Sequence, residues 1–135
     1  MAFQMSVSLR NARADTIETH VGASAVIKMR TGAVPANCAA ADAGTVLATI
    51  TLPANWMENA ANGIKTLLGT WEDLSADSAG TVGHFRLYAA DGTTCHGQGT
   101  VTATAGGGDM TVDNVVFAAG QKFSITGFTI TEGNA

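Results

Sequence analysis

Three histidines and two cysteines are the side chains of this sequence that could hold a transition metal. Zinc sites usually draw on close pairs such as C-x2-C or H-x3-H, and neither spacing occurs here. His96 follows Cys95 directly, and neighbours on a strand point to opposite faces, so the two are not expected to share one ion. We expect no metal and no cofactor, and we expect His20 to have a packing or edge role on a helix.

Cysteine chemistry has two further interpretations. A nucleophilic pair of Cys38 or Cys95 with His84 would need a local signature, and the sequence has none. The opening residues MAFQMSVSLR lack the basic start and the apolar run of a secretory signal, which indicates folding in a cytoplasm. In that reducing compartment two separate thiols are the favoured state, and a disulfide formed after release from the cell is the alternative.

Acidic residues could supply oxygen ligands for calcium. The candidates are Glu72, Asp73, Asp77, Asp91 and Asp109. They do not match the loop D-x-[DN]-x-[DN]-G, and solvated acidic loops are far commoner. The run AGGGD at residues 105–109 lacks the GK[ST] ending of a phosphate-binding loop, and G-x-S-x-G, HExxH and GxGxxG motifs do not occur. We therefore predict that the protein is not an enzyme.

The length of 135 residues fits a single domain, with an N-terminal arm and helix over 1–22 and a β-sandwich over 23–135. Only 13% of the residues are charged, and the net charge is -4. That balance argues against nucleic-acid binding, which needs a basic face. The least charged apolar stretch, residues 43–57, contains Pro53 and Asn55 and is too short to span a membrane.

Residues 7–21 have the spacing of an amphipathic helix. Ser6 suits the N-cap position, and Gly22 stands where a left-handed C-cap is needed. One side carries the apolar side chains of Val7, Ala14, Ile17 and Val21, and the other carries Asn11, Asp15 and Glu18. Arginines come early and acids late, which opposes the helix macrodipole. Such a helix is expected to depend on docking against its own sheet or a neighbouring chain.

After Gly22 the hydrophobic period changes from 3.6 to 2, as in half-buried strands. Asp91-Gly92 marks a hairpin turn, and a phase change across Gly127 predicts a β-bulge in which glycine takes left-handed geometry. Residues 33–44 have no period and are expected to form a long loop. We predict a mainly β fold, a single-domain antiparallel β-sandwich of six or seven strands with one N-terminal α-helix.

One predicted strand carries His84, Arg86 and Tyr88 in alternation with apolar residues, so these three are expected to face away from the core. They form either a solvated polar face or part of a contact surface. Low charge and many small side chains on outward strand faces are typical of surfaces in repeated contact with other subunits. An Ala- and Gly-rich composition inherited from a GC-rich genome is the alternative explanation.

Three blocks between Leu9 and Val101 resemble one family: LRNARADTIETHVGASAVIKMRTG, PANCAAADAGTVLATITLP and GHFRLYAADGTTCHGQGTV. The tail FTITEGNA is similar too. The family comprises small proteins of tailed-bacteriophage and prophage genomes that are associated with virion structural genes. The resemblance implies a virion component, in particular a capsid decoration or cement protein on the outside of the capsid lattice. It implies no catalytic residues.

A decoration protein would bind the major capsid protein or other virion subunits and is expected to form homo-oligomers in the virion, after synthesis in the host cytoplasm. The expected partner contacts are Leu9, Arg10, Arg13, Cys38, His84, Arg86 and Tyr88. The alternatives are a tail or head–tail connector component and a tail-tip module that binds host-surface carbohydrate. For the latter, the aromatic candidates are Trp56, Trp71 and Tyr88. A cell-wall hydrolase ranks last.

Overall fold

The computed structural model describes residues 2–135 and is mainly β, with one N-terminal helix, as predicted. Its elements are α1 (Val7–Val21), β1 (Val26–Thr31), β2 (Val46–Thr51), β3 (Ile64–Thr66), β4 (Glu72–Asp73), β5 (Gly80–Tyr88), β6 (Cys95–Ala103), β7 (Met110–Val112), β8 (Val116–Phe117) and β9 (Phe123–Thr131). The helix of this described part is neither long nor apolar enough to cross a membrane.

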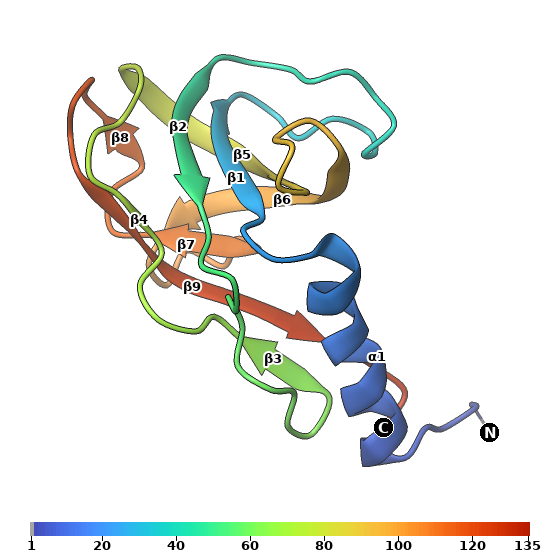
Figure 1. Cartoon of the computed structure of the whole chain (residues 1–135). Helices are drawn as coiled ribbons and strands as arrows, with labels where there is room; N and C mark the ends of the chain where they lie inside the picture. Colours follow the sequence, from blue (N-terminus) through green and yellow to red (C-terminus); the bar gives the residue numbers. More distant parts are fainter. Residues whose placement is uncertain (1) are drawn as a thin grey trace.

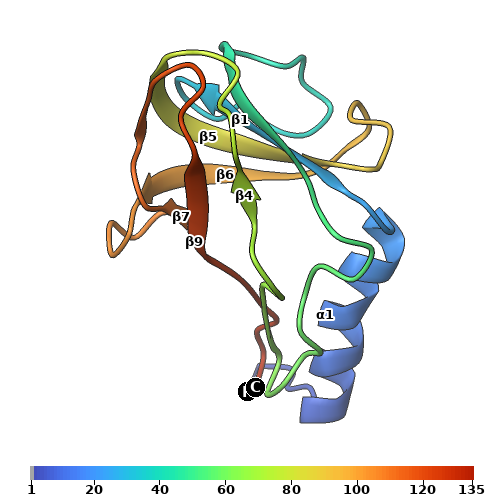
Figure 2. The same ribbon diagram turned by 60° about the vertical axis from the view of Figure 1, so that its left-hand side comes forward.

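The strands form one curled sheet in the order β2-β1-β5-β6-β7-β9-β3, while β4 pairs with β9 and β8 with β5. Figure 1 shows β9 crossing below β5 and β6, so that the two halves of the sheet face each other roughly as in a sandwich. The apolar core lies between them and includes Ile27, Met29, Phe85, Trp71 and Phe123. Helix α1 packs beside β3 (Figure 1), and Figure 2 shows the helix at the lower edge of the molecule, below the curled sheet.

The strand count exceeds the expected six or seven, because four short strands of two or three residues add to the long ones. The pairing of β6 with β7 is parallel, whereas an antiparallel arrangement was expected throughout. The turn between these strands brings the backbone very close to Thr102. A Cβ at Gly106 would lie 2.7 Å from the hydroxyl oxygen of Thr102, so glycine lets the chain reverse in so little space.

The predicted helix is confirmed at both ends. The Ser6 hydroxyl accepts a hydrogen bond from the amide of Leu9 at 3.1 Å, and Gly22 has φ 96° and donates to the carbonyl of Glu18. The predicted hairpin is confirmed as well, because β5 and β6 pair on either side of the turn at Asp91-Gly92. These local signals are strong because each satisfies backbone groups within a few residues.

The bulge at Gly127 is confirmed, but the reason given for it is wrong. Thr111 pairs with Gly127 and Val112 with Ile125, so β9 carries one extra residue. Gly127 does not adopt a left-handed φ. Instead, a Cβ there would lie 2.8 Å from the hydroxyl oxygen of Thr111, so the glycine is needed for space rather than for backbone geometry.

Strand β1 is buried on both faces, which corrects the expectation of a half-buried strand. Ile27 and Met29 enter the main core, as their alternation indicates, while Val26 and Arg30 are buried on the opposite face. The cover on that second face is the loop of residues 33–44, which hydrogen bonds to side chains of β1 and β5.

Candidate functional site

The polar face of β1, β5 and β6 is closed off by the loop of residues 33–44, which we call the covering loop. His84, Arg86 and Tyr88 lie beneath it with exposures of 0%, 2% and 0%. The prediction that these three side chains point outward to a partner is therefore wrong. Alternation along a strand identifies which residues share a face, but the face is buried because a distant loop packs on it.

Arg86 is the centre of the contacts that hold the covering loop. Its guanidinium donates to the carbonyls of Asn37 at 2.9 Å and Ala40 at 3.0 Å, to the Asp42 carboxylate at 2.7 Å, and to the side chain of Gln98 at 3.1 Å. Because Nε and both Nη atoms are bonded, the plane of the guanidinium group is fixed, and with it the position of the covering loop. Arg86 thus positions the loop.

Asp42 connects the covering loop to two more buried side chains. Its carboxylate accepts from Arg30 at 2.7 Å and from the hydroxyl of Tyr88 at 2.8 Å, besides Arg86. Burial would raise the pKa of Asp42, but the hydrogen bonds from Tyr88 and Arg86 and the charges of Arg30 and Arg86 outweigh it and hold this pKa below its usual range. Burial and the bond to Asp42 raise the pKa of Tyr88. The carboxylate is ionised at neutral pH.

His84 is held by one ring nitrogen only. Its Nδ1 lies 2.9 Å from the carbonyl of Gly32, so Nδ1 carries the proton and donates to it. Its Nε2 is buried and finds no hydrogen-bond partner among residues 2–135. Neither cysteine is available to it as a nucleophile, because Cys38 and Cys95 are joined to each other.

The two cysteines form a disulfide, with Cα atoms 5.4 Å apart, so the favoured expectation of separate thiols is wrong. The alternative expectation of a disulfide between Cys38 and Cys95 is confirmed. Cys38 lies in the covering loop and Cys95 begins β6. The covering loop is thereby attached to the sheet by a covalent bond as well as by Arg86 and Asp42.

Replacing both cysteines with Ser is expected to lower the free energy of unfolding by about 2–4 kcal/mol, because the bond closes a separation of 57 residues in the unfolded chain. Urea unfolding with and without reductant checks this. Reductant should bring the natural protein to the stability of the double variant and should leave the variant unchanged. Equal stability of the natural protein and the double variant in the absence of reductant would contradict the prediction.

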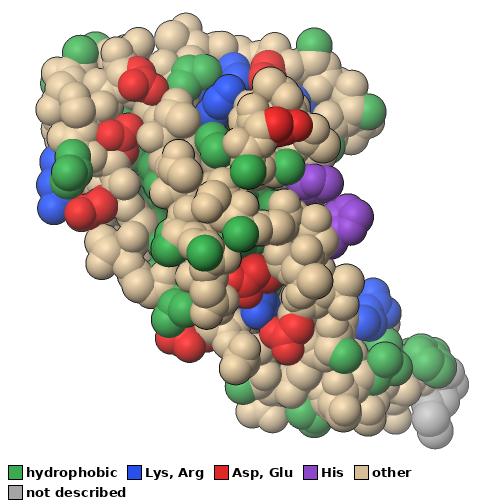
Figure 3. All heavy atoms as spheres, in the orientation of Figure 1, with side chains coloured by type: hydrophobic (Ala, Val, Ile, Leu, Met, Phe, Trp, Pro, Cys, Tyr) green, Lys and Arg blue, Asp and Glu red, His purple; other side chains and the backbone are tan. Residues whose placement is uncertain are grey.

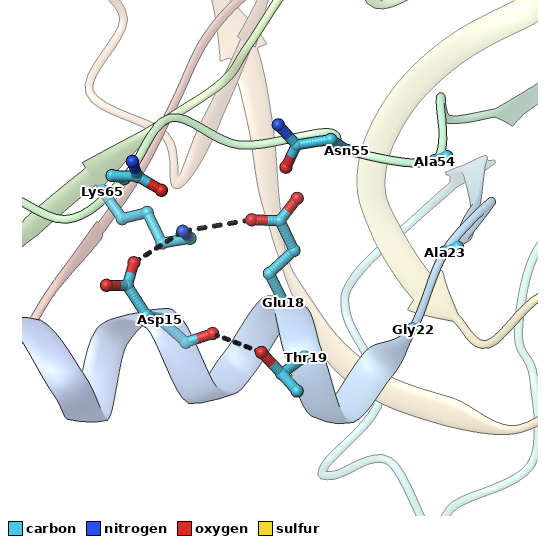
Figure 4. A pocket seen from close by; sticks show the side chains of 9 residues that line it. Asp15, Glu18, Thr19, Gly22, Ala23, Ala54, Asn55 and Lys65 are labelled. Atoms are coloured by element: carbon cyan, nitrogen blue, oxygen red, sulfur yellow. Dashed lines mark hydrogen bonds and ion pairs between the residues drawn. The ribbon is translucent and has the colours of Figure 1, made fainter.

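A second polar cluster lies between α1 and the segment of residues 54–66, at an open pocket of about 400 Å³. Figure 4 shows the amine of Lys65 between the carboxylates of Asp15 and Glu18. The Nζ atom lies 2.8 Å from Asp15, 3.1 Å from Glu18 and 2.8 Å from the carbonyl of Glu58. The three donors of the ammonium group therefore each have an acceptor.

The charges of this cluster stabilise one another. Burial would lower the pKa of Lys65, but the hydrogen bonds and charges of Asp15 and Glu18 outweigh it and raise this pKa above its usual value. The hydrogen bond from Lys65, together with the backbone amide of Ala60, lowers the pKa of Asp15. Lys65 is thus protonated at neutral pH and has no free lone pair, so it is not a nucleophile there. The cluster acts as a clamp.

The polar side of α1 binds backbone groups of residues 56–63, so the expected docking of the helix is made within its own chain. Glu18 accepts from the amides of Trp56 at 2.7 Å and Met57 at 3.0 Å. Asp15 accepts from Ala60 at 2.9 Å, and Asn11 accepts from Gly63 at 2.7 Å. The order of charges along the helix was the only sequence signal for this arrangement, because acids placed against the macrodipole need other partners.

The first half of α1 lies beside the C-terminal tail and carries Leu9, Arg10 and Arg13. The guanidinium of Arg10 donates to the carbonyl of Asn62 at 3.0 Å, and Arg13 pairs with Glu132 at 3.2 Å. Leu9 makes no such contact and is 46% exposed. The two arginines therefore serve contacts within the chain, and Leu9 remains a candidate for contact with a partner.

The arm and the first turn of α1 carry three exposed apolar side chains. Phe3 is 75% exposed, and Val7 and Leu9 are each 46% exposed. We call these three residues the apolar end. The amide of Met5 donates to the carbonyl of Asn134 at 2.7 Å, which joins the arm to the C-terminal tail. Figure 3 shows hydrophobic side chains at this lower right end of the molecule.

The aromatic residues proposed for sugar stacking are all inside the protein. Trp56, Trp71 and Tyr88 have exposures of 0%, 1% and 0%, and the two tryptophan rings pack together with centres 5.9 Å apart. A carbohydrate-binding face needs exposed rings. The three candidates therefore cannot form one in this structure.

The acidic residues weighed as calcium ligands each accept hydrogen bonds or pair with a lysine. Glu72 pairs with Lys122, Asp73 accepts from the amide of Thr49, and Asp77 accepts from the hydroxyl of Thr49. Asp91 caps its own turn and Asp109 accepts from Thr100, which lowers the pKa of both carboxyls. Within residues 2–135, no three His, Cys, Asp or Glu side chains gather closely enough to hold a metal ion.

No protein-family model, curated protein or solved structure matches this chain.

Proposed function

We propose that the protein is a non-enzymatic structural subunit of a tailed-phage virion, a capsid decoration protein that bridges major capsid subunits and associates with copies of itself. The observation that carries the proposal is the apolar end, where Phe3, Val7 and Leu9 project from the arm and the first turns of α1. Three exposed large apolar side chains between residues 3 and 9 offer apolar area that a partner could bury.

The energetics of a repeated lattice suit such a small contact. Burying apolar area contributes roughly 25 cal/mol per Å², so one arm supplies only a modest free energy once the association costs are subtracted. Many identical copies on one particle bind through avidity, which multiplies weak contacts without enlarging any of them. Only 13% of the residues are charged, which supports close packing of neighbouring copies, because charged side chains are depleted from the centres of interfaces.

The fixed shape of the sheet supports a role outside the cell. The disulfide between Cys38 and Cys95 and the buried contacts of Arg86 both attach the covering loop to the strands beneath it. Disulfides persist in oxidising surroundings such as the outside of a released particle. A decoration protein made in the host cytoplasm would gain this bond after release.

Replacing Phe3 with Ser and Leu9 with Gln together is expected to reduce binding to capsids at least about tenfold, since each buried apolar side chain contributes roughly 1.5–3 kcal/mol. The measurement is the number of copies per major capsid protein, by quantitative mass spectrometry of particles assembled with each variant. The matched control is Leu74→Gln, because Leu74 is 68% exposed and lies outside the apolar end. Its occupancy should equal that of the natural protein.

The copy number itself separates the proposal from its alternatives. A ratio to the major capsid protein near one, or a simple fraction of it, is expected for a decoration protein. A handful of copies per particle would overturn the capsid role in favour of a tail or connector component. Absence from purified particles would overturn the structural role altogether.

A further inference from the structure

Two histidines that are far apart in the sequence meet on the surface. His20 comes from the last turn of α1 and His96 from the start of β6. Their ring centres are 5.1 Å apart, with the ring planes at 85°. Both side chains are exposed, and Figure 3 shows the histidine side chains side by side at the right-hand edge of the molecule.

The two rings line an open hollow of about 260 Å³ between the helix and the sheet. Thr16, Ile17 and Val21 of α1 form the rest of its lining. The hollow is therefore largely apolar, and the imidazole nitrogens are its main groups that can bind a cation.

We propose that His20 and His96 form a binding site for a divalent ion of the zinc, copper or nickel type, with one nitrogen from each ring as a ligand. A metal–nitrogen bond of about 2.0–2.1 Å and a tetrahedral angle place two imidazole centres about 5 Å apart. The observed separation of 5.1 Å is already that distance, so rotation of exposed side chains suffices to turn the nitrogens toward one ion.

The donor set decides which ions fit. Imidazole suits zinc, copper and nickel, whereas calcium and magnesium need oxygen ligands, which this hollow does not gather. Since no group of three metal-ligating side chains exists within residues 2–135, water completes the coordination of the ion. The bound ion forms a bridge between the end of α1 and the start of β6, so metal binding stabilises the folded protein. This proposal is independent of the proposed role in the virion.

Titration of the metal-free, oxidised protein with zinc chloride at pH 7.5 tests the site, by calorimetry and by the imidazole proton signals in NMR spectra. One equivalent should bind, and the signals of His20 and His96 should shift. The signal of the buried His84 should stay unchanged, which provides an internal control in the same spectrum. The melting temperature should rise with zinc, because the ion binds only the folded arrangement.

Two variants locate the ion. His20→Ala and His96→Ala should each weaken zinc binding at least about tenfold, because even the loss of an outer-shell partner weakens metal binding roughly 10–100-fold. Each should also abolish the rise in melting temperature. Glu58→Gln, which alters an exposed carboxylate outside the hollow, should bind zinc like the natural protein. Binding that survives both histidine replacements, or no binding at millimolar zinc, would overturn the proposal.

Discussion

Replacing Arg86 with Met is expected to lower the free energy of unfolding by about 3 kcal/mol, which corresponds to a fall in melting temperature of about 10 °C. Methionine fills a similar volume but donates no hydrogen bond. It would leave the carbonyl of Ala40 without its donor and remove one donor each from the carbonyl of Asn37 and the carboxylate of Asp42. Removing one partner of a buried ion pair costs roughly 3–5 kcal/mol, and the lower end applies because Asp42 is partly exposed to water.

The matched control is Lys28→Met, which removes the same charge from the neighbouring strand. Lys28 lies directly opposite Arg86 in β1, and its amine is 5.1 Å from the ring centre of Tyr88. A cation near an aromatic ring contributes about 0.5–1 kcal/mol at such a site, so this variant should lose far less stability. If the two variants unfold at the same denaturant concentration, the disulfide rather than Arg86 holds the covering loop.

The pH dependence of stability separates Asp42 from the other groups of this face. Because its pKa is lowered in the folded protein, the unfolded chain binds the proton first as the pH falls. The contribution of Asp42 is therefore present above the ordinary pKa of about 3.9 and is lost as the pH falls through the lower folded value. Asp42→Asn should be less stable at pH 7 and should lose less additional stability on acidification.

The buried polar face explains which part of the fold could be predicted from the sequence. Helix α1 and the hairpin of β5 and β6 carry local signals, such as the cap at Ser6 and the turn at Asp91-Gly92, that act within a few residues. The covering loop has no period, because its contacts are made by carbonyls and a single carboxylate. From the sequence alone, an arginine that alternates with apolar residues on a strand and is covered by such a loop cannot be distinguished from one that faces solvent.

The same limit applies to pairs of residues that are distant in the chain. Lys65 meets Asp15 and Glu18 because β3 pairs with β9 beside α1, and no short spacing in the sequence encodes that pairing. His20 and His96 meet for a similar reason, because the end of α1 lies beside the start of β6. The sequence shows which side chains carry charge or can bind a metal. Which of them meet depends on the topology of the sheet and cannot be predicted from their spacing.

Replacing Lys65 with Met is expected to lower the free energy of unfolding by about 3 kcal/mol, the second large effect. The side chain is 2% exposed, and its loss leaves two carboxylates close together with no cation between them. Lys122→Met is the matched control, because Lys122 also pairs with a carboxylate, that of Glu72 at 2.9 Å, but is 56% exposed. An exposed ion pair contributes about 0–1 kcal/mol, so the control should remain nearly as stable as the natural protein.

A change at alkaline pH identifies the charge of Lys65 as the cause. Its pKa is raised on folding, so its contribution is fully present below the ordinary value of about 10.4 and is lost as the pH rises through the higher folded value. Tyr88, whose pKa is also raised, causes a loss in the same direction. Lys65→Met should therefore show a shallower, but not absent, decline in stability above pH 10.

A double-mutant cycle of Lys65→Met with Glu18→Gln measures the part of the clamp that acts through Glu18. If the ammonium group joins α1 to residues 54–66 through Glu18, the combined variant should lose less stability than the sum of the single losses, because the neutral amide no longer needs a cation. Strict additivity would show that the ammonium group stabilises the protein through Asp15 and the carbonyl of Glu58 and not through Glu18. Helix α1 would then be docked by Ala14, Val21 and the backbone bonds of Glu18, with no contribution from the pair of Lys65 and Glu18.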